Sequence, residues 1–220
     1  ASFNNTFNDD FKPYLLVSTD KGKSWTPITD GLPENGSVHT IEQDFVNKDL
    51  LFCGTEFGAF FSNNGGKKWI QLKSGIPTTA VYDMAIQQRE TDLVLATFGR
   101  GMYVMDNYSP LRNFNENTLN ETAKMYPIKD ALVYIEADGR YGQGSTYFLA
   151  KNRDFGATFT YFVKEVPKTD KENRQKTEKD LFDKGEKMPV YDWKTIQDQD
   201  KQLNPYFIFR ITDEKGNVIR

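Results

Sequence analysis

Short apolar runs of strand length recur along the first half of the chain. Gly, Pro, Asn and Asp interrupt them, which is the pattern of β-strands joined by tight turns. We therefore predict strands at Tyr14–Ser18, Trp25–Ile28, Val38–Phe45, Leu50–Thr55, Ala59–Ser62, Trp69–Leu72, Val81–Gln87, Leu93–Thr97 and Met102–Asp106. The order of these runs repeats about every 44 residues, which indicates a repeat architecture.

One motif occurs twice, with the pattern Ser-x-Asp/Asn-x-Gly-x-x-Trp followed by Gly, an apolar residue and Pro. It is STDKGKSWTPITDGLP at 18–33 and SNNGGKKWIQLKSGIP at 62–77. The equivalent positions are Ser18 and Ser62, Asp20 and Asn64, Gly22 and Gly66, and Trp25 and Trp69.

The residue types of this motif favour a structural role in a tight turn over a catalytic role. Ser, Asp and Asn side chains hydrogen-bond the backbone of a turn, and Gly supplies the positive φ that the turn needs. We expect each Trp to pack its ring on a neighbouring sheet. Asn64 can make a turn but is no general acid or base, which favours a structural role for both Asp20 and Asn64 over a catalytic one.

The spacing of the strands predicts a β-propeller. Four strands in about 44 residues form a propeller blade, and the repeated motif favours this fold over a solenoid. The segments GTEFGAFFS (Gly54–Ser62) and ATFGRGMYVMD (Ala96–Asp106) look like the same hairpin, with one residue inserted. Only about two and a half blades fit before Pro110, whereas closed propellers have roughly four or more. We therefore assign 1–112 to the last blades of a partial propeller and expect a fragment of a longer protein.

The composition changes after the last predicted blade. Residues 113–127 belong to a linker rich in Asn, Pro and Thr. Further strands are predicted at Ala131–Ala137, Thr146–Ala150, Ala157–Lys164 and Tyr206–Asp213, and the last begins a hairpin with its turn at Asp213–Asn217. This all-β pattern predicts an immunoglobulin- or fibronectin-type β-sandwich over 128–220, with fewer strands than the usual seven.

A charged insertion, Glu165–Asn204, interrupts the predicted sandwich. Thr169 and Glu172 form a capping box that opens a helix over Asp170–Lys184, and Asp192–Lys201 is a candidate for a second helix. Both charge signs are interspersed, so a solvated helical arm is favoured over a charge-driven binding site.

Composition excludes several function classes. The formal net charge of the 220 residues is -3, with no basic stretch suited to nucleic acid. No apolar run approaches the ~20 residues of a membrane span. The chain has one cysteine and one histidine, Cys53 and His39, which is almost no raw material for a zinc site or a Cys–His dyad. We expect no metal and no cofactor, and a buried, inert Cys53.

The motif resembles the Asp-box, or BNR repeat, of bacterial secreted proteins whose propellers are related to that of sortilin. The segments that carry the resemblance are DDFKPYLLVSTDKGKSW, LLFCGTEFGAFFS, ETDLVLATFGRGMYVMDNYSPLR, FGATFTYFVKE and ITDEKGNVIR. It implies the carboxy-terminal end of a BNR-repeat propeller with a trailing sandwich domain, in a secreted, periplasmic or cell-envelope protein. The cysteine-rich module that follows sortilin propellers is absent, so sortilin-like cargo binding is not implied.

Two function classes follow from the sequence. The first is a non-catalytic binding or scaffold module for a protein or glycan ligand. The second is a sialidase-like glycoside hydrolase, whose active site would need further blades and an arginine cluster. Arg100, between two glycines, and Glu56, at the matching turn, are the candidate ligand-binding residues; we assign no catalytic residue. Open sheet edges predict self-association or contacts with the remaining blades of the parent protein.

Overall fold

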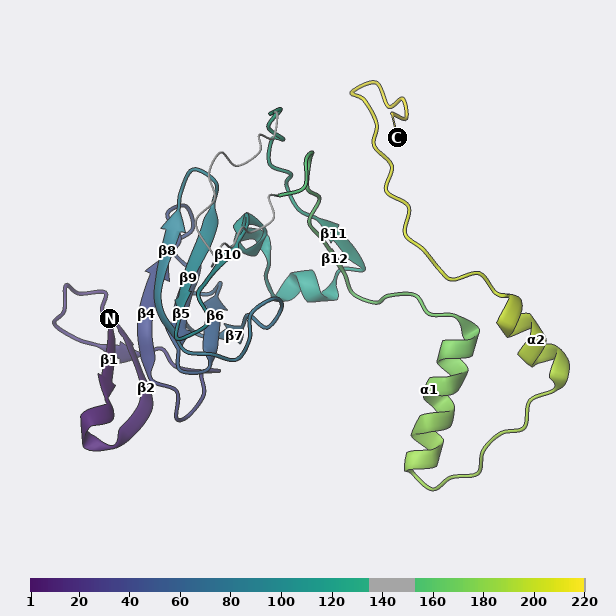
Figure 1. The fold of residues 1–220 in the computed structure, drawn as a ribbon, viewed down its shortest axis with the longest axis horizontal. Coiled ribbons are helices and arrows are strands. Elements are labelled where there is room, and N and C mark those ends of the chain that lie inside the picture. The colour runs from purple at the N-terminus through teal and green to yellow at the C-terminus, as the bar shows by residue number, and fades with distance from the viewer. Residues whose placement is uncertain (135–152, 220) are drawn as a thin grey trace, which may run out of the picture. The chain divides into compact units, whose positions relative to one another are not determined.

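A computed structural model of the chain describes residues 1–134 and 153–219 (Figure 1). The chain is mainly β: four antiparallel sheets are formed, and the described residues contain two α-helices. The all-β class is confirmed at this level. Two compact units are present, Ala1–Phe162 and Val163–Arg220. Among the described residues, none of the helices is long and apolar enough to cross a membrane.

Three sheets follow one another along residues 1–105. The first contains β1 (Ser2–Asn5), β2 (Asp10–Val17) and β3 (Thr26–Pro27), with a short 3₁₀ turn, η1 (Thr6–Asn8), between β1 and β2. The second contains β4 (Val38–Gln43), β5 (Leu51–Thr55), β6 (Gly58–Ser62) and β7 (Ile70–Gln71). The third contains β8 (Val81–Gln87), β9 (Asp92–Thr97) and β10 (Met102–Met105). Each predicted strand of this region overlaps one of β2 to β10.

The second sheet is covered on both faces. Leu51 and Cys53 of β5 belong to an apolar cluster shared with the first sheet, which supplies Leu15. Leu50 and Phe52 belong to a second cluster, shared with β8 and β9 of the third sheet. Consecutive strand residues point to opposite faces, so a strand covered on both sides buries the residues of both its faces. Every residue of β5 and β6 is buried accordingly.

The close approach of the second and third sheets depends on a glycine. A Cβ atom on Gly54 of β5 would lie 2.5 Å from the carbonyl oxygen of Val81 on β8. That separation is far inside van der Waals contact, so no larger residue fits without moving the two sheets apart. In Figure 1, β5 and β8 lie in the same stack of strands.

A buried ion pair fastens the segment after β10 to the second sheet. Asp44, fully buried after β4, accepts hydrogen bonds from the Arg112 guanidinium at 2.7 and 2.9 Å and from the Tyr108 hydroxyl at 2.6 Å. Burial alone would raise the pKa of Asp44, but the bonds from Arg112, Tyr108 and the Asn47 amide hold it below its ordinary value. Burial and the bond to Asp44 raise the pKa of the Tyr108 hydroxyl. Arg112 lies on a 3₁₀ segment, η2 (Ser109–Asn113).

The predicted sandwich is not confirmed by the described residues. After η3 (Glu116–Asn120), β11 (Ala123–Met125) pairs with β12 (Tyr161–Val163), the only part of the predicted strand Ala157–Lys164 that is a strand. Thr146–Ala150 lies outside the described residues, as does the end of Ala131–Ala137, whose residues 131–134 are not a strand. Tyr206–Asp213 is irregular, although the turn at Asp213–Asn217 forms and is closed by a bridge from Thr212 to Val218. The described residues after β10 form one two-stranded ribbon, which is too little to make two facing sheets.

The charged insertion forms the two predicted helices, α1 (Asp170–Asp183) and α2 (Trp193–Lys201). The Thr169 hydroxyl accepts from the Glu172 amide, and the Glu172 carboxylate accepts from the Thr169 amide, as a capping box requires. Polar side chains join the helices: the Lys171 ammonium lies 2.8 Å from the Asp200 carboxylate. No residue of either helix is buried, as predicted for a solvated arm.

Candidate functional site

The two copies of the repeated motif form the same hydrogen-bonded turn. The Ser18 hydroxyl donates to Asp20 Oδ1 (2.8 Å) and accepts from the Gly22 amide (2.7 Å). At the second copy, the Ser62 hydroxyl donates to Asn64 Oδ1 (2.8 Å) and accepts from the Gly66 amide (2.9 Å). The polar side chains therefore bond to their own turn in both copies.

Acidification is expected to loosen the first turn and to leave the second intact. Hydrogen bonds from Ser24 and Ser18 lower the pKa of Asp20 from its ordinary value of 3.8 to about 2. Because this folded-state pKa is depressed, the bonds are fully present above the ordinary pKa and are lost as the pH falls through the folded-state value. Asn64 does not titrate.

Amide NMR shifts of Gly22 and Ser24, followed from about pH 5 to about pH 2, should move with Asp20, while those of Gly66 and Lys68 should not. Asp20→Asn is the matched control and should remove the difference. Equal movement at both turns would contradict the assignment.

The two tryptophans of the motif lie in different surroundings. Trp69 is 2% exposed, and its indole N–H donates to the Ile28 carbonyl of the preceding copy (2.7 Å). Trp25 is 47% exposed. The expected packing of each ring on a neighbouring sheet is therefore observed for Trp69 and not for Trp25, because no described segment covers the first sheet as the first sheet covers the second.

β-bulges mark the same point in the second and third sheets. The pairing of β4 with β5 shifts between Val38 and Thr40, and the pairing of β8 with β9 shifts between Val81 and Asp83. His39 and Tyr82 are the extra residues. Bulges redirect a side chain and are over-represented beside functional sites. Here they bring the two rings together, with centroids 4.4 Å apart.

A row of side chains extends from this pair to both hairpin tips. On one side, Glu56 of the β5–β6 turn lies 3.0 Å from His39 Nε2. On the other side, Phe98 of the β9–β10 turn packs edge-on against Tyr82, with centroids 5.7 Å apart. We call Glu56, His39, Tyr82 and Phe98 the bulge row. Tyr82 is 48% and Phe98 69% exposed, so the row presents aromatic surface to solvent.

Arg100 lies on the same turn as Phe98. Thr97 closes this turn by donating to the Gly101 carbonyl (2.6 Å), and Thr55 closes the β5–β6 turn by donating to the Gly58 carbonyl (3.1 Å). The two turns are thus built alike, and Glu56 and Arg100 lie in equivalent hairpins of adjacent sheets. Arg100 is exposed.

A carboxyl pair lies on the same two strands as the bulge row. Burial, together with the negative charge of Asp83 on β8, raises the pKa of Glu42 on β4. A raised carboxyl pKa is a feature of general acids, although structural carboxyl groups share it. Among the described residues, no three His, Cys, Asp or Glu side chains are placed to hold a metal ion.

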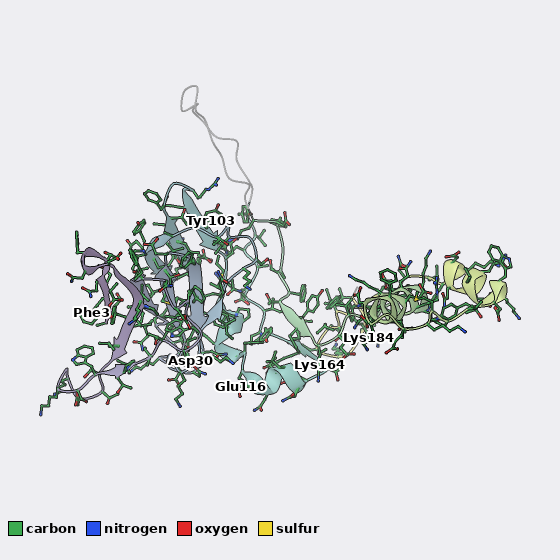
Figure 2. The ribbon with its side chains drawn as sticks, turned by 90° about the horizontal axis from the view of Figure 1, so that it is seen from below. Phe3, Asp30, Tyr103, Glu116, Lys164 and Lys184 are labelled. Carbon is green, nitrogen blue, oxygen red and sulfur yellow. The ribbon has the colours of Figure 1, made fainter. Side chains whose placement is uncertain are left out.

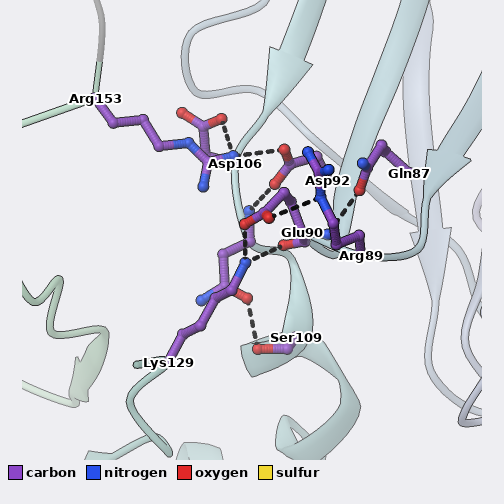
Figure 3. A network of polar contacts seen from close by, with 9 residues as sticks. Gln87, Arg89, Glu90, Asp92, Asp106, Ser109, Lys129 and Arg153 are labelled. Atoms are coloured by element: carbon purple, nitrogen blue, oxygen red, sulfur yellow. Dashed lines mark hydrogen bonds and ion pairs between the residues drawn. The ribbon is translucent and has the colours of Figure 1, made fainter. Parts of the chain in front are cut away.

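A second polar cluster lies at the opposite ends of β9 and β10 (Figure 3). Arg153 pairs with Asp92 and lies 2.7 Å from Asp106, and Lys129 pairs with Glu90. Glu90, Asp106, Lys129 and Arg153 line part of a pocket of about 500 Å³. Both cations have carboxylate partners, so the cluster connects segments beyond β10 to the third sheet and leaves neither cation unpaired.

Sequence reasoning named Glu56 and Arg100 as candidates but did not name the aromatic side chains between them. The signal was present, because SVHTI at 37–41 and AVYDM at 80–84 place His39 and Tyr82 equivalently. The bulges that expose them depend on strand pairing, which the apolar pattern does not specify. No protein-family model matches the chain, and no curated protein matches it either.

Proposed function

We propose that this chain is a non-catalytic binding module whose ligand contacts the bulge row and Arg100. The observation that carries the proposal is the packing of His39, Tyr82 and Phe98 across two adjacent sheets, with the rings of Tyr82 and Phe98 exposed. Exposed aromatic residues offer large, rigid contact area at a low cost in conformational entropy. His39, Tyr82 and Phe98 are held in place by two equivalent bulges and by the equivalent turns of two regular sheets.

The charged residues beside the bulge row can orient a bound ligand. Glu56 is paired with His39, whereas Arg100 has no ion pair with any residue of the described chain. Its guanidinium carries five donors for a carboxylate or hydroxyl group of a ligand. A ligand with one flat face and one polar acceptor therefore fits this surface.

The larger context is also a proposal. The repeated motif and the three successive sheets favour the last blades of a BNR-repeat propeller, from a larger secreted or cell-envelope protein. Two neighbouring sheets packed face to face, with equivalent bulges and equivalent turns, support this architecture.

The alternative, a sialidase-like hydrolase, has less support. Its substrate carboxylate needs several converging arginines. In the described part of the first unit, Arg112 is bound to Asp44 and Arg153 to Asp92 and Asp106. The raised pKa of Glu42 is the one observation that favours acid–base chemistry.

The proposal is tested by binding of the labelled chain to a glycan array and to a peptide array, which separates the two ligand classes. Tyr82→Ala and Arg100→Ala should each weaken retention of a bound ligand about tenfold, equivalent to about 1.4 kcal/mol. Phe7→Ala and Arg89→Ala are matched controls, because both side chains are highly exposed and lie outside the row. Equal losses in all four variants, or no retained ligand on either array, would contradict the proposal.

A further inference from the structure

The contact between the first two sheets defines how one copy of the motif binds the next. The Trp69 indole N–H donates to the Ile28 carbonyl (2.7 Å), and the Trp69 backbone N–H donates to the Asp30 carbonyl (2.8 Å). Gly31 has φ +89°, and a Cβ there would lie 2.5 Å from the Trp69 carbonyl oxygen. The preceding copy therefore supplies two carbonyl acceptors and a glycine.

Gly66 belongs to the same contact. A Cβ on Gly66 would lie 2.7 Å from the Ile28 Cδ1 atom of the preceding copy. The motif turn, the indole and the backbone of Trp69 thus all contact one short segment, Ile28–Pro33. Its sequence is apolar–x–Asp–Gly–apolar–Pro from position 28, and 72–77 has the same form with Ser for Asp.

The first sheet carries the same binding surface without a cover. Trp25 stands where Trp69 stands in the second sheet, and its ring is 47% exposed. At Gly22, the equivalent of Gly66, the only side chain within reach is Trp25 itself. Phe3 is 51% exposed at the outer edge of the unit, where Figure 2 labels it.

Strand alternation places Phe3, Leu16 and Trp25 on one face of the first sheet. Leu15 is buried against the second sheet, so Tyr14 and Leu16 point to the opposite side of β2. Phe3 pairs with Tyr14 across the sheet and shares that side. In the second sheet the equivalent side, which includes Phe60, Cys53 and Trp69, is buried.

We propose that the face formed by Phe3, Leu16 and Trp25 is a docking surface for another repeat unit with a segment of the Ile28–Pro33 type. The occupant offers a carbonyl to the Trp25 indole N–H, a second carbonyl to the Trp25 backbone N–H, and a glycine of positive φ where the backbones meet. The existing contact of Trp69 with the first sheet supplies this geometry. The proposal concerns a different surface from the bulge row; it rests on the repeat architecture proposed above and not on ligand binding at the bulge row.

The probe is the synthetic peptide TPITDGLP, the sequence of Thr26–Pro33, added to the whole chain. The indole N–H signals of the chain are assigned by Trp→Phe variants. We expect a saturable shift of the Trp25 signal with a dissociation constant in the millimolar range. Trp193, 72% exposed in the second unit, is the control for unspecific contact, and buried Trp69 should not respond.

The matched control peptide TPITDVLP replaces the glycine by valine and should shift the Trp25 signal at least tenfold less at equal concentration. No shift up to about 10 mM peptide, equal shifts with both peptides, or an equal shift of Trp193 would each overturn the proposal. A Trp25 shift that depends on protein concentration without peptide, and that the peptide does not compete away, would also overturn it, because a different surface of a second copy would then cover the face.

Discussion

Replacing Trp69 by alanine is expected to lower the free energy of unfolding by about 3–5 kcal/mol, the usual range for a buried tryptophan. The ring is 2% exposed, belongs to the cluster between the first and second sheets, and donates its indole N–H to Ile28. Its removal leaves a cavity and an unpaired carbonyl. Urea unfolding curves of the variant and the wild type measure the difference.

Trp25→Ala is the matched control, because it changes the same residue of the same motif at a site that is half exposed. We expect it to cost less than about 1 kcal/mol, since partly exposed side chains lose little burial on truncation. Similar losses for both variants would show that the two motif copies are equally covered in solution. The expected difference rests on the neighbouring sheet and not on the motif itself.

Arg112→Met is expected to destabilise the chain by about 3–5 kcal/mol, because it leaves the charge of Asp44 buried and unpaired. Asp44 is fully buried, and Arg112 supplies two of its hydrogen bonds. Arg89→Met is the control, since the Arg89 side chain is 82% exposed and its pair with Glu90 is a surface pair worth little. Urea unfolding again gives both values.

The pH dependence of the Arg112 variant provides an independent check. In the wild type the pKa of Asp44 is depressed, so its contribution to stability is present above the ordinary pKa and is lost as the pH falls through the folded-state value. Without Arg112, burial dominates and raises that pKa, so the variant should regain stability relative to the wild type as the pH falls. A deficit that does not change between neutral and acidic pH would contradict the ion-pair explanation.

The strands of residues 14–106 could be predicted because their turns are specified locally. Ser18 and Ser62 bond the backbone of their own turns, and such bonds need no distant partner. The capping box at Thr169 is equally local, and both predicted helices form. What the motif could not predict is that Trp69 is buried while Trp25 is exposed, because burial depends on which sheet lies opposite.

The candidate site was predictable only in part, for the same physical reason. Glu56 and Arg100 stand out in tight, glycine-containing turns. His39 and Tyr82 became neighbours only through two bulges, which are set by the register of each hairpin. Beyond residue 127, an alternating segment such as ATFTYFVK forms a strand only where a partner strand lies beside it. That occurs at Tyr161–Val163 (β12), which pairs with β11.

Cys53 lies at the centre of the twice-covered second sheet, and this placement gives the chain a single internal reporter of local opening. The thiol has no solvent exposure, and burial raises its pKa, so the reactive thiolate is suppressed in the closed state. An alkylating reagent can reach it only when the first sheet separates from the second or the β5–β6 hairpin opens. The rate of alkylation therefore measures how often the most protected part of this sheet stack comes apart, without any engineered label.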